Sequence, residues 1–552
     1  MEGPLARNED RRRGPVSTRP IRRLGTIGAI AAAIFAVVSL GLLCLHGNRL
    51  IFHVDEGSLL DAAERMLHGQ TVYRDFFVYI APGSLWMQEA AFRLFGLSMW
   101  AGRVVAICDL AVECALVFWL TARLAGKRVG LATATLFFAF QAAMPELLAA
   151  QHRIDGAALS LASIALCVAG QQRRKMGYWA GAGVLAAWAA ACTPPLALLA
   201  LPAMVWLLAS RPLRRFSIPY VCGASACSAS IAAALAAQGA LLPFIGQMIW
   251  LRHNYAGMAA MPYGAVIGGY RAALGASVAG GGGVTGALAL FCFALPAVLP
   301  PVALAAWSLT LLRSRDERRR AADGAIPYLL ACMAMEVVSA YPRADLLHLA
   351  FVAALPAVLT AVWIARYAPG WLVPVFAVPA ACALVFLAEA ASPLGSEVAA
   401  VSPVGTLRVS ASDAPAVAAL LKTVHPGDSL YVHPYMPMLY FLTQARNPTR
   451  YSHIVPGLMT HADETAVLDD LERSPPRWVL YFPIGRAGFL QTFPSATNLD
   501  HRFPTIEAWR LREYAPVEPP VDVRGYRLYE RRTVPAASPG GGLGNRAGRA
   551  GN

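Results

Sequence analysis

Two adjacent carboxylates follow the first long apolar segment of the chain, in the run His53-Val54-Asp55-Glu56-Gly57. Charged side chains at the boundary of a membrane are costly and usually have a function. Two neighbouring negative charges also repel each other unless a cation lies close to them. A carboxylate in such a place can take a proton from a hydroxyl group, or it can bind a hard metal ion. Asp55 and Glu56 are therefore candidate catalytic residues.

Two later segments combine an arginine with an aspartate two residues further on, next to an apolar run. They are Arg153 with Asp155, and Arg343 with Asp345, the second followed by His348. Arginine suits the binding of a phosphate group because its N–H donors are charged and fixed in one plane. Plainer interpretations stay open: Asp155 and Asp345 as helix N-caps, the arginines as contacts to lipid headgroups, and His348 as a buried core residue.

The composition is that of a membrane protein with many spans. Of the 552 residues, 57% are hydrophobic and 14% are charged. Since a spanning helix needs about 20 mostly apolar residues, the sequence predicts about eleven such helices. They are centred on residues 24–46, 101–122, 129–144, 156–170, 177–192, 195–209, 217–237, 284–312, 325–340, 346–365 and 371–390. The expected fold is a mainly α, polytopic membrane protein.

Much of the basic charge behind the net +14 stands in clusters before and between the predicted spans. With an N-terminus in the cytoplasm, eleven spans put every cluster on the cytoplasmic side, as the positive-inside rule requires. The same topology puts Asp55, Arg153 and Arg343 on the outer face. No soluble basic surface is predicted, which argues against nucleic acid as a partner. The clusters are Arg11–Arg13, Arg22–Arg23, Arg123–Arg128, Arg173–Lys175, Arg211–Arg215 and Arg313–Arg320.

The chain divides into four predicted parts. Residues 1–23 form a polar, basic cytoplasmic segment that we expect to be disordered, and 24–390 form the membrane domain, with a first outer loop at 47–100. Residues 391–533 lose the long apolar runs and predict a small α/β domain outside the cytoplasm, and the Pro/Gly/Ala-rich tail 534–552 is expected to be disordered.

Periodicity predicts the elements of the outer parts. In the first outer loop, apolar residues at helical spacing predict an amphipathic helix over 59–67, capped by Ser58, and a second helix over 84–95. In the C-terminal domain, strands are predicted over 429–432 and 478–481, and helices over 414–423 and 462–472.

The first half of the chain resembles the GT-C glycosyltransferases. The resemblance rests on an ordered series that begins with Asp55-Glu56 after the first span. It continues with the runs Gly69-Gln70-Thr71-Val72-Tyr73-Arg74-Asp75-Phe76-Phe77, Ala81-Pro82-Gly83-Ser84 and Leu94-Phe95-Gly96, and with Arg103 and Arg153–Asp155. Over residues 50–200 the sequence is similar to the bacterial protein O-mannosyltransferase and aminoarabinose transferase group.

The resemblance implies an enzyme of the bacterial inner membrane. Such an enzyme moves a sugar, with inversion, from a polyprenyl-phosphate-linked donor to a glycan, lipid or protein acceptor on the outer face. Its surroundings are membrane lipids. No lysine-bearing motif for aminoarabinose transfer is found, which disfavours that sugar.

The resemblance also implies roles for individual residues. Asp55 matches the first acidic position, the general base or a carboxylate that positions it, and Glu56 matches the second, a supporting group or metal ligand. Arg153 and Arg343 are chosen for the donor phosphate by charge and location. A divalent metal stays open, with Asp55 and Glu56 as its first candidate ligands. The expected supporting residues are Tyr73, Asp75, Asp155, Asp345 and His348.

Two other functions remain as alternatives. A transporter or flippase of lipid-linked saccharides would place polar groups near the middle of the bilayer, often within inverted repeats. Here the charged residues concentrate on one face, and the sequence shows no internal repeat. A membrane scaffold whose outer domain binds a partner is the third interpretation.

Overall fold

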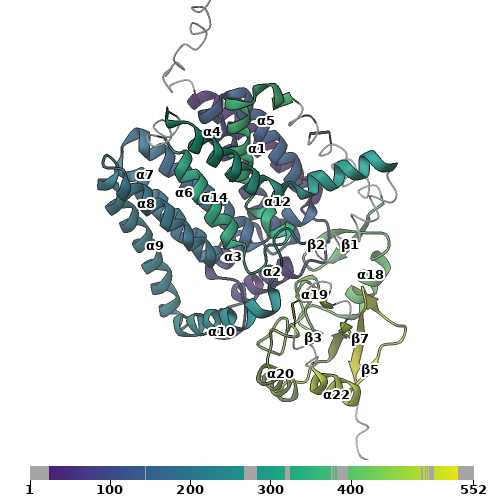
Figure 1. Ribbon diagram of the computed structural model, residues 1–552. Coiled ribbons are helices and arrows are strands. Elements are labelled where there is room, and N and C mark those ends of the chain that lie inside the picture. Colours follow the sequence, from purple (N-terminus) through teal and green to yellow (C-terminus); the bar gives the residue numbers. More distant parts are fainter. Residues whose placement is uncertain are drawn as a thin grey trace, which may run out of the picture.

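The computed structural model describes residues 24–532 with several gaps. The gaps are 143, 267–281, 317–323, 374–376, 378–379, 382–395, 487–488, 491–492, 494 and 497–502. Long helices pack side by side into a bundle, and a smaller domain of mixed helices and strands lies against one end of it (Figure 1). The predicted disordered segments, 1–23 and 534–552, lie outside the described residues.

The bundle consists of apolar helices that alternate in direction. Its members are α1 (Leu24–His46), α4 (Met99–Ala125), α5 (Lys127–Ala142), α6 (His152–Arg173), α7 (Met176–Cys192), α8 (Ala200–Ala209), α9 (Ser217–Ala237), α12 (Gly282–Arg313), α14 (Ile326–Ser339) and α16 (Ala354–Tyr367). Within the described part of the chain, five helical segments are long and apolar enough to cross a membrane; they are 28–46, 99–125, 152–173, 214–237 and 293–313. Ile34, Val37 and Ile218 expose their side chains on such helices, as lipid-facing residues do.

The helices of the bundle follow the predicted spans closely, but the count of eleven stays a prediction. Shorter apolar helices pack among the long ones, including α7, α14 and α16. The predicted span 346–365 is broken at Val352 and Ala353 into α15 (Leu346–Phe351) and α16. The last predicted span, 371–390, falls mostly outside the described residues.

A layer of shorter helices covers the end of the bundle opposite the basic turns. It contains α2 (Val54–Leu67), α3 (Pro82–Phe95), α10 (Leu241–Ala259) and α15. The predicted cap of α2 was wrong. The helix begins four residues before Ser58, because the ring Nδ1 of His53 accepts the backbone N–H of Glu56 at 3.3 Å. The Ser58 hydroxyl instead donates to the carbonyl oxygen of Val54 inside the helix.

The C-terminal domain is built on a mixed sheet. Its strands β3 (Leu430–His433) and β4 (Trp478–Tyr481) are parallel, and β7 (Tyr526–Arg531) pairs antiparallel with β4, β5 (Tyr514–Pro516) and β6 (Asp522–Val523). The strand order is β3-β4-β7-β5. Both predicted strands lie within one residue of β3 and β4, and all side chains of these two strands are buried.

Helices and a hairpin complete this domain. The predicted helices are confirmed as α18 (Ala414–Thr423) and α20 (His461–Arg473). The domain contains two further helices, α19 (Met438–Thr443) and α22 (Pro504–Glu513). The hairpin of β1 (Val398–Ser402) and β2 (Gly405–Val409) connects the domain to the bundle, because Leu50 donates its backbone N–H to the carbonyl of Arg408 at 2.8 Å.

The C-terminal domain docks on α2. A Cβ atom added to Gly57 would lie 2.4 Å from the backbone nitrogen of Met438, so α19 packs directly on the backbone of α2. About two turns further, Arg65 donates to the hydroxyl of Ser452 at 3.0 Å and to the carbonyl of Thr449 at 3.3 Å. The helix that carries the Asp55-Glu56 pair is therefore part of the contact between the bundle and the C-terminal domain.

The first prediction concerns this close approach. Replacing Gly57 with alanine should lower the thermal unfolding midpoint of the detergent-solubilised protein and speed its cleavage by protease, because the added methyl group must push α19 away from α2. Gly246→Ala on α10 is the matched control, since no atom lies within 4 Å of its added Cβ. Equal midpoints for the two variants would contradict the packing described.

Candidate active site

Asp55 stands in the first turn of α2 with its side chain half-buried. The hydroxyl of Tyr79 donates a hydrogen bond of 2.6 Å to its Oδ1 atom. Its second oxygen, Oδ2, has no hydrogen-bond partner within the described residues. Because His53 caps the helix, the carboxylate of Asp55 is not needed as a cap. One oxygen thus remains available to a substrate.

The charge state of Asp55 follows from its neighbours. Burial by itself would raise the pKa of this carboxyl group, but the nearby His53 and the hydrogen bond from Tyr79 outweigh burial and lower the pKa to about 2. Burial and the adjacent Asp55 charge both raise the pKa of Tyr79, so its hydroxyl keeps the proton that it donates. At neutral pH, Asp55 is an ionised carboxylate.

Glu56 has a different environment, although it is the next residue. Its two oxygens accept from Nε and Nη2 of Arg103 on α4, at 2.8 and 2.9 Å, and both side chains are at most 1% exposed. The backbone N–H of Ala150 adds a third hydrogen bond at 3.1 Å. Nη1 of Arg103 donates to the carbonyls of His46 and Arg49, each at 2.6 Å. This pair therefore joins α2 to α4 and to the end of α1.

Arg153 lies in the first turn of α6, and its guanidinium forms no hydrogen bond or ion pair within the described part of the chain. It is half-buried, close to the rings of His152 and His348. The N-cap interpretation of Asp155 was wrong, because Gln151 is the cap residue of α6. The Asp155 side chain is 2% exposed and lies beside Ser84 and Asp109 in the bundle.

The second arginine is held by its own segment. Arg343 donates from Nε to Oδ2 of Asp345 at 2.9 Å, and its guanidinium lies 4.8 Å from the ring centroid of Phe493. Oδ1 of Asp345 accepts the backbone N–H of His348 at 3.0 Å and contacts its Nδ1 at 2.8 Å. The N-cap interpretation of Asp345 is therefore confirmed. Asp345 also orients the side chains of Arg343 and His348.

The structure brings these side chains to one place. Asp55 lies within electrostatic range of His152 and His348, and both histidines lie within that range of Arg153. Tyr255 of α10 interacts with Asp55 and with the two arginines. The result is a polar cluster between α2, α6, α10 and the segment before α15, which contains an ionised carboxylate and two arginines.

Two predicted supporting residues are not found in contact with this cluster. Asp75 forms a partly exposed ion pair with Arg74 and accepts the backbone N–H of Thr71. The Tyr73 side chain is fully buried, and its hydroxyl donates to the carbonyl of Ile80 at 2.8 Å. Tyr73 therefore holds the loop on either side of Tyr79, whereas Asp75 makes its contacts away from the cluster.

The carboxylates considered for a divalent metal do not converge. Both oxygens of Glu56 are occupied by Arg103, Asp75 pairs with Arg74, and Asp155 lies beside Asp109. No group of three or more His, Cys, Asp or Glu side chains suited to a metal ion occurs among the described residues. Asp55 alone would leave a hard cation short of ligands, so no metal-dependent step is assigned.

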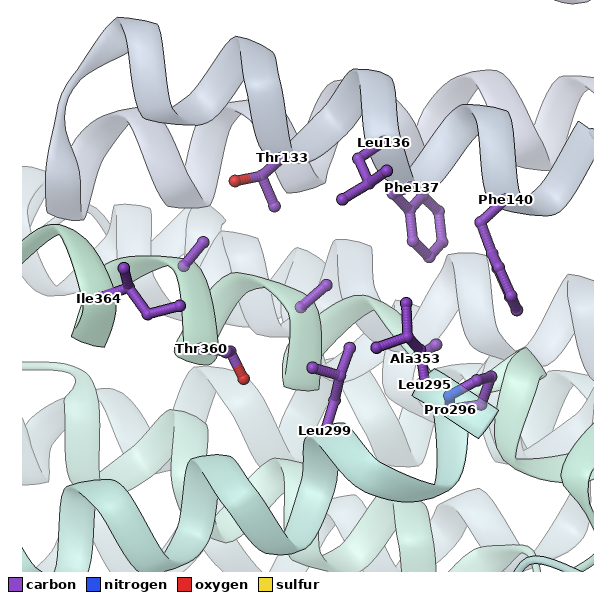
Figure 2. A pocket seen from close by; sticks show the side chains of 12 residues that line it. Thr133, Leu136, Phe137, Phe140, Leu295, Pro296, Leu299, Ala353, Thr360 and Ile364 are labelled. Atoms are coloured by element: carbon purple, nitrogen blue, oxygen red, sulfur yellow. The ribbon is translucent and has the colours of Figure 1, made fainter. Parts of the chain in front are cut away.

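An apolar cavity opens between α5, α12 and α16 (Figure 2). Phe137 and Phe140 line it from α5, and Leu299 lines it from α12. At its outer end, Phe140 packs against the cluster that contains Leu347 and Phe351 of α15. Because α15 also carries His348, one end of the cavity lies beside a helix that contributes to the polar cluster.

Comparisons with known proteins agree with this architecture. A family model described as dolichyl-phosphate-mannose-protein mannosyltransferase matches residues 80–236. Among solved structures, ArnT from Cupriavidus metallidurans bound to undecaprenyl phosphate matches with a TM-score of 0.54 at 15% identity, over 90% of this chain and 97% of that chain. The chain has a GT-C fold. The predicted resemblance is therefore confirmed, and the comparisons indicate a membrane glycosyltransferase.

Two further results complete the comparison. The oligosaccharyltransferase of Archaeoglobus fulgidus, in complex with Zn and sulfate, matches with a TM-score of 0.47 at 13% identity, over 91% of this chain and 73% of that chain. No curated protein sequence matches this chain significantly.

Sequence reasoning missed several residues that complete the candidate site. Tyr79 lies between two quoted motifs but carries no signal of its own, and His53 was read only as part of the run around Asp55. Arg103 was noted for its place in the series, without a partner. The repulsion expected between Asp55 and Glu56 was a usable signal, since it called for a cation near one of them.

The second prediction tests the buried ion pair. Arg103→Met leaves the charge of Glu56 buried and unpaired, which should cost about 3–5 kcal/mol of unfolding free energy. Arg93→Met is the control, because Arg93 pairs with Glu89 at the surface and is 61% exposed; its loss should change stability by at most about 1 kcal/mol. Thermal unfolding in detergent measures both. Similar midpoints for the two variants would show that Glu56 does not depend on Arg103.

Proposed function

We propose that this membrane glycosyltransferase moves a sugar from a polyprenyl-phosphate-linked donor to a hydroxyl group of a cell-envelope acceptor, at the outer face of the membrane. The observation that carries the proposal is the ionised Asp55, whose free oxygen shares one polar cluster with Arg153 and Arg343. A carboxylate opposite two arginines suits a reaction in which a hydroxyl loses a proton while a phosphate gains charge.

The proposed reaction is a single displacement. Oδ2 of Asp55 accepts the proton of the acceptor hydroxyl, and the acceptor's oxygen forms a bond to the anomeric carbon of the sugar. The bond between that carbon and the phosphate oxygen breaks, and its electron pair stays on the phosphate. Because the attack comes from the face opposite the leaving phosphate, the configuration inverts. The leaving phosphate gains one negative charge, which Arg153 and Arg343 stabilise through charge-assisted hydrogen bonds.

The two arginines fit this role in different ways. Arg153 has no hydrogen bond or ion pair in the described part of the chain, so its donors are available to a ligand. Arg343 is held in one orientation by Asp345 and by the ring of Phe493. A cation with unused donors beside one that is held in place can bind the phosphate and stabilise the charge that it gains during transfer.

The donor lipid also has a place in this proposal. A polyprenyl chain is a long hydrocarbon, and the cavity between α5, α12 and α16 is lined mainly by apolar side chains. Its outer end reaches the helix of His348. A match to ArnT, whose structure contains undecaprenyl phosphate, supports a carrier of this chemical class.

The third prediction concerns the base. Asp55→Asn should abolish the glycan product that mass spectrometry finds in the envelope of cells with the protein and not in cells without it, because an amide does not accept the proton. Undecaprenyl phosphate binding should persist in this variant. Asp75→Asn is the control, since Asp75 pairs with Arg74 outside the cluster. Product formation by Asp55→Asn would exclude the base role.

The same measurement has a pH dependence. A pKa of about 2 keeps Asp55 ionised throughout the range from pH 5 to pH 8. As pH falls, a base of depressed pKa is lost only near that pKa, so titration of Asp55 should not reduce the transfer rate between pH 7 and pH 5. A decline of the transfer rate between pH 7 and pH 5, while undecaprenyl phosphate binding and the folded fraction stay constant, would contradict this assignment.

The fourth prediction concerns the donor phosphate. Arg153→Gln should weaken the binding of undecaprenyl phosphate to the solubilised protein about tenfold, since a charge-assisted hydrogen bond contributes roughly 1.5–3 kcal/mol. Arg252→Gln serves as the control, because Arg252 is an exposed residue of α10. Equal affinities for the two variants would remove Arg153 from the phosphate site.

A further inference from the structure

A segment of the C-terminal domain is fixed to the first outer loop, more than 370 residues earlier in the chain. Phe77 donates its backbone N–H to the carbonyl of Arg450 at 2.8 Å, and its ring lies 5.3 Å from that of Tyr451. The hydroxyl of Ser452 donates to Asp61 of α2 and accepts from Arg65. These contacts leave the following residue, His453, little freedom to move.

His453 lies against the side chain that supports the proposed base. Its ring is 4.9 Å from the ring of Tyr79, with 85° between the two planes, and the residue is 4% exposed. Tyr79 is in turn the donor to Oδ1 of Asp55. An edge-to-face contact of this kind is favourable in one relative orientation, so it restricts rotation of the tyrosine ring.

The chemistry of His453 favours a role as a ring and not as an acid or base. Burial lowers its pKa to about 4, and the opposing influence of Asp55 is smaller. The imidazole is therefore neutral between pH 5 and pH 8, where Asp55 is ionised. Its following residue, Ile454, donates its backbone N–H to the carbonyl of Pro434 at 2.7 Å, so the segment is also anchored at the end of β3.

We infer that His453 is a positioning residue of the transfer reaction: the C-terminal domain, through His453 and Tyr79, holds Asp55 in its productive orientation. This rests on the proposed function. The acceptor side of the site is then complete only when the C-terminal domain is docked on α2. Figure 1 shows this domain against the layer that contains α2 and α10.

The fifth prediction separates the ring contact from histidine chemistry. His453→Ala should reduce the rate of product formation about 10- to 100-fold, as expected when a reacting group is displaced by a fraction of an ångström to one ångström. His453→Phe keeps an aromatic ring beside Tyr79 and should restore most of the rate. Undecaprenyl phosphate binding should be unchanged in both variants, because the phosphate residues lie on other segments.

The coupling to Tyr79 gives a second, independent readout. Tyr79→Phe keeps the ring but removes the hydrogen bond to Asp55, so it should slow transfer as well. If His453 acts through Tyr79, adding His453→Ala to Tyr79→Phe should slow transfer much less than it does alone. A double variant whose loss of rate equals the product of the two single losses would overturn the inference. Each rate is normalised to the amount of folded protein measured by gel filtration, so a less stable His453→Ala variant can still be compared.

Controls distinguish this inference from the proposed function. His425→Ala replaces an exposed histidine of the same domain and should leave the rate unchanged. If the unaltered protein yields no product, the proposed function itself is wrong. If it yields product, Asp55→Asn yields none and His453→Ala matches the unaltered protein, only the positioning role is wrong. Equal loss in His453→Ala and His453→Phe would also overturn it, in favour of a direct role for the imidazole.

Discussion

The site depends on the buried ion pair between Glu56 and Arg103. Its two parallel hydrogen bonds fix the direction of the guanidinium, whose remaining donors then bind the carbonyls at the end of α1. Removing two charges from water costs much of what their attraction returns, so such a pair adds little to stability by itself. Its contribution is to select one arrangement of α1, α2 and α4, because any other leaves a charge buried without its partner.

This constraint explains how two adjacent carboxylates take different tasks. Neighbouring residues of a helix point about 100° apart, so when Glu56 turns toward α4, Asp55 must turn toward the space between α2 and α6. The capping histidine, His53, then spares Asp55 from binding the helix end. One residue anchors the helix and the next is free to react, and neither role is visible from residue type alone.

The sequence predicted the helices better than the contacts. Long apolar runs such as 217–237 and periodic segments such as 414–423 carry their own signal, and the structure reproduces them. The start of α2 was misplaced because a histidine cap is uncommon, and serine is the usual choice. Asp75 was grouped with the site because it stands in the same motif as Tyr73. The fold, however, turns that segment so that Asp75 faces Arg74 at the surface. His453 had no signal at all, since its partner Tyr79 lies more than 370 residues earlier.

That separation along the chain has a consequence for how the protein is made. A ribosome delivers Asp55 soon after the first predicted span, but the aromatic ring that supports its hydrogen-bonding partner follows about 400 residues later, in the C-terminal domain. A chain cut short after the bundle would carry both arginines and the carboxylate without the ring of His453 that lies against Tyr79. If His453 positions Tyr79 as inferred, the candidate site is complete only after this domain has been synthesised and has docked on α2.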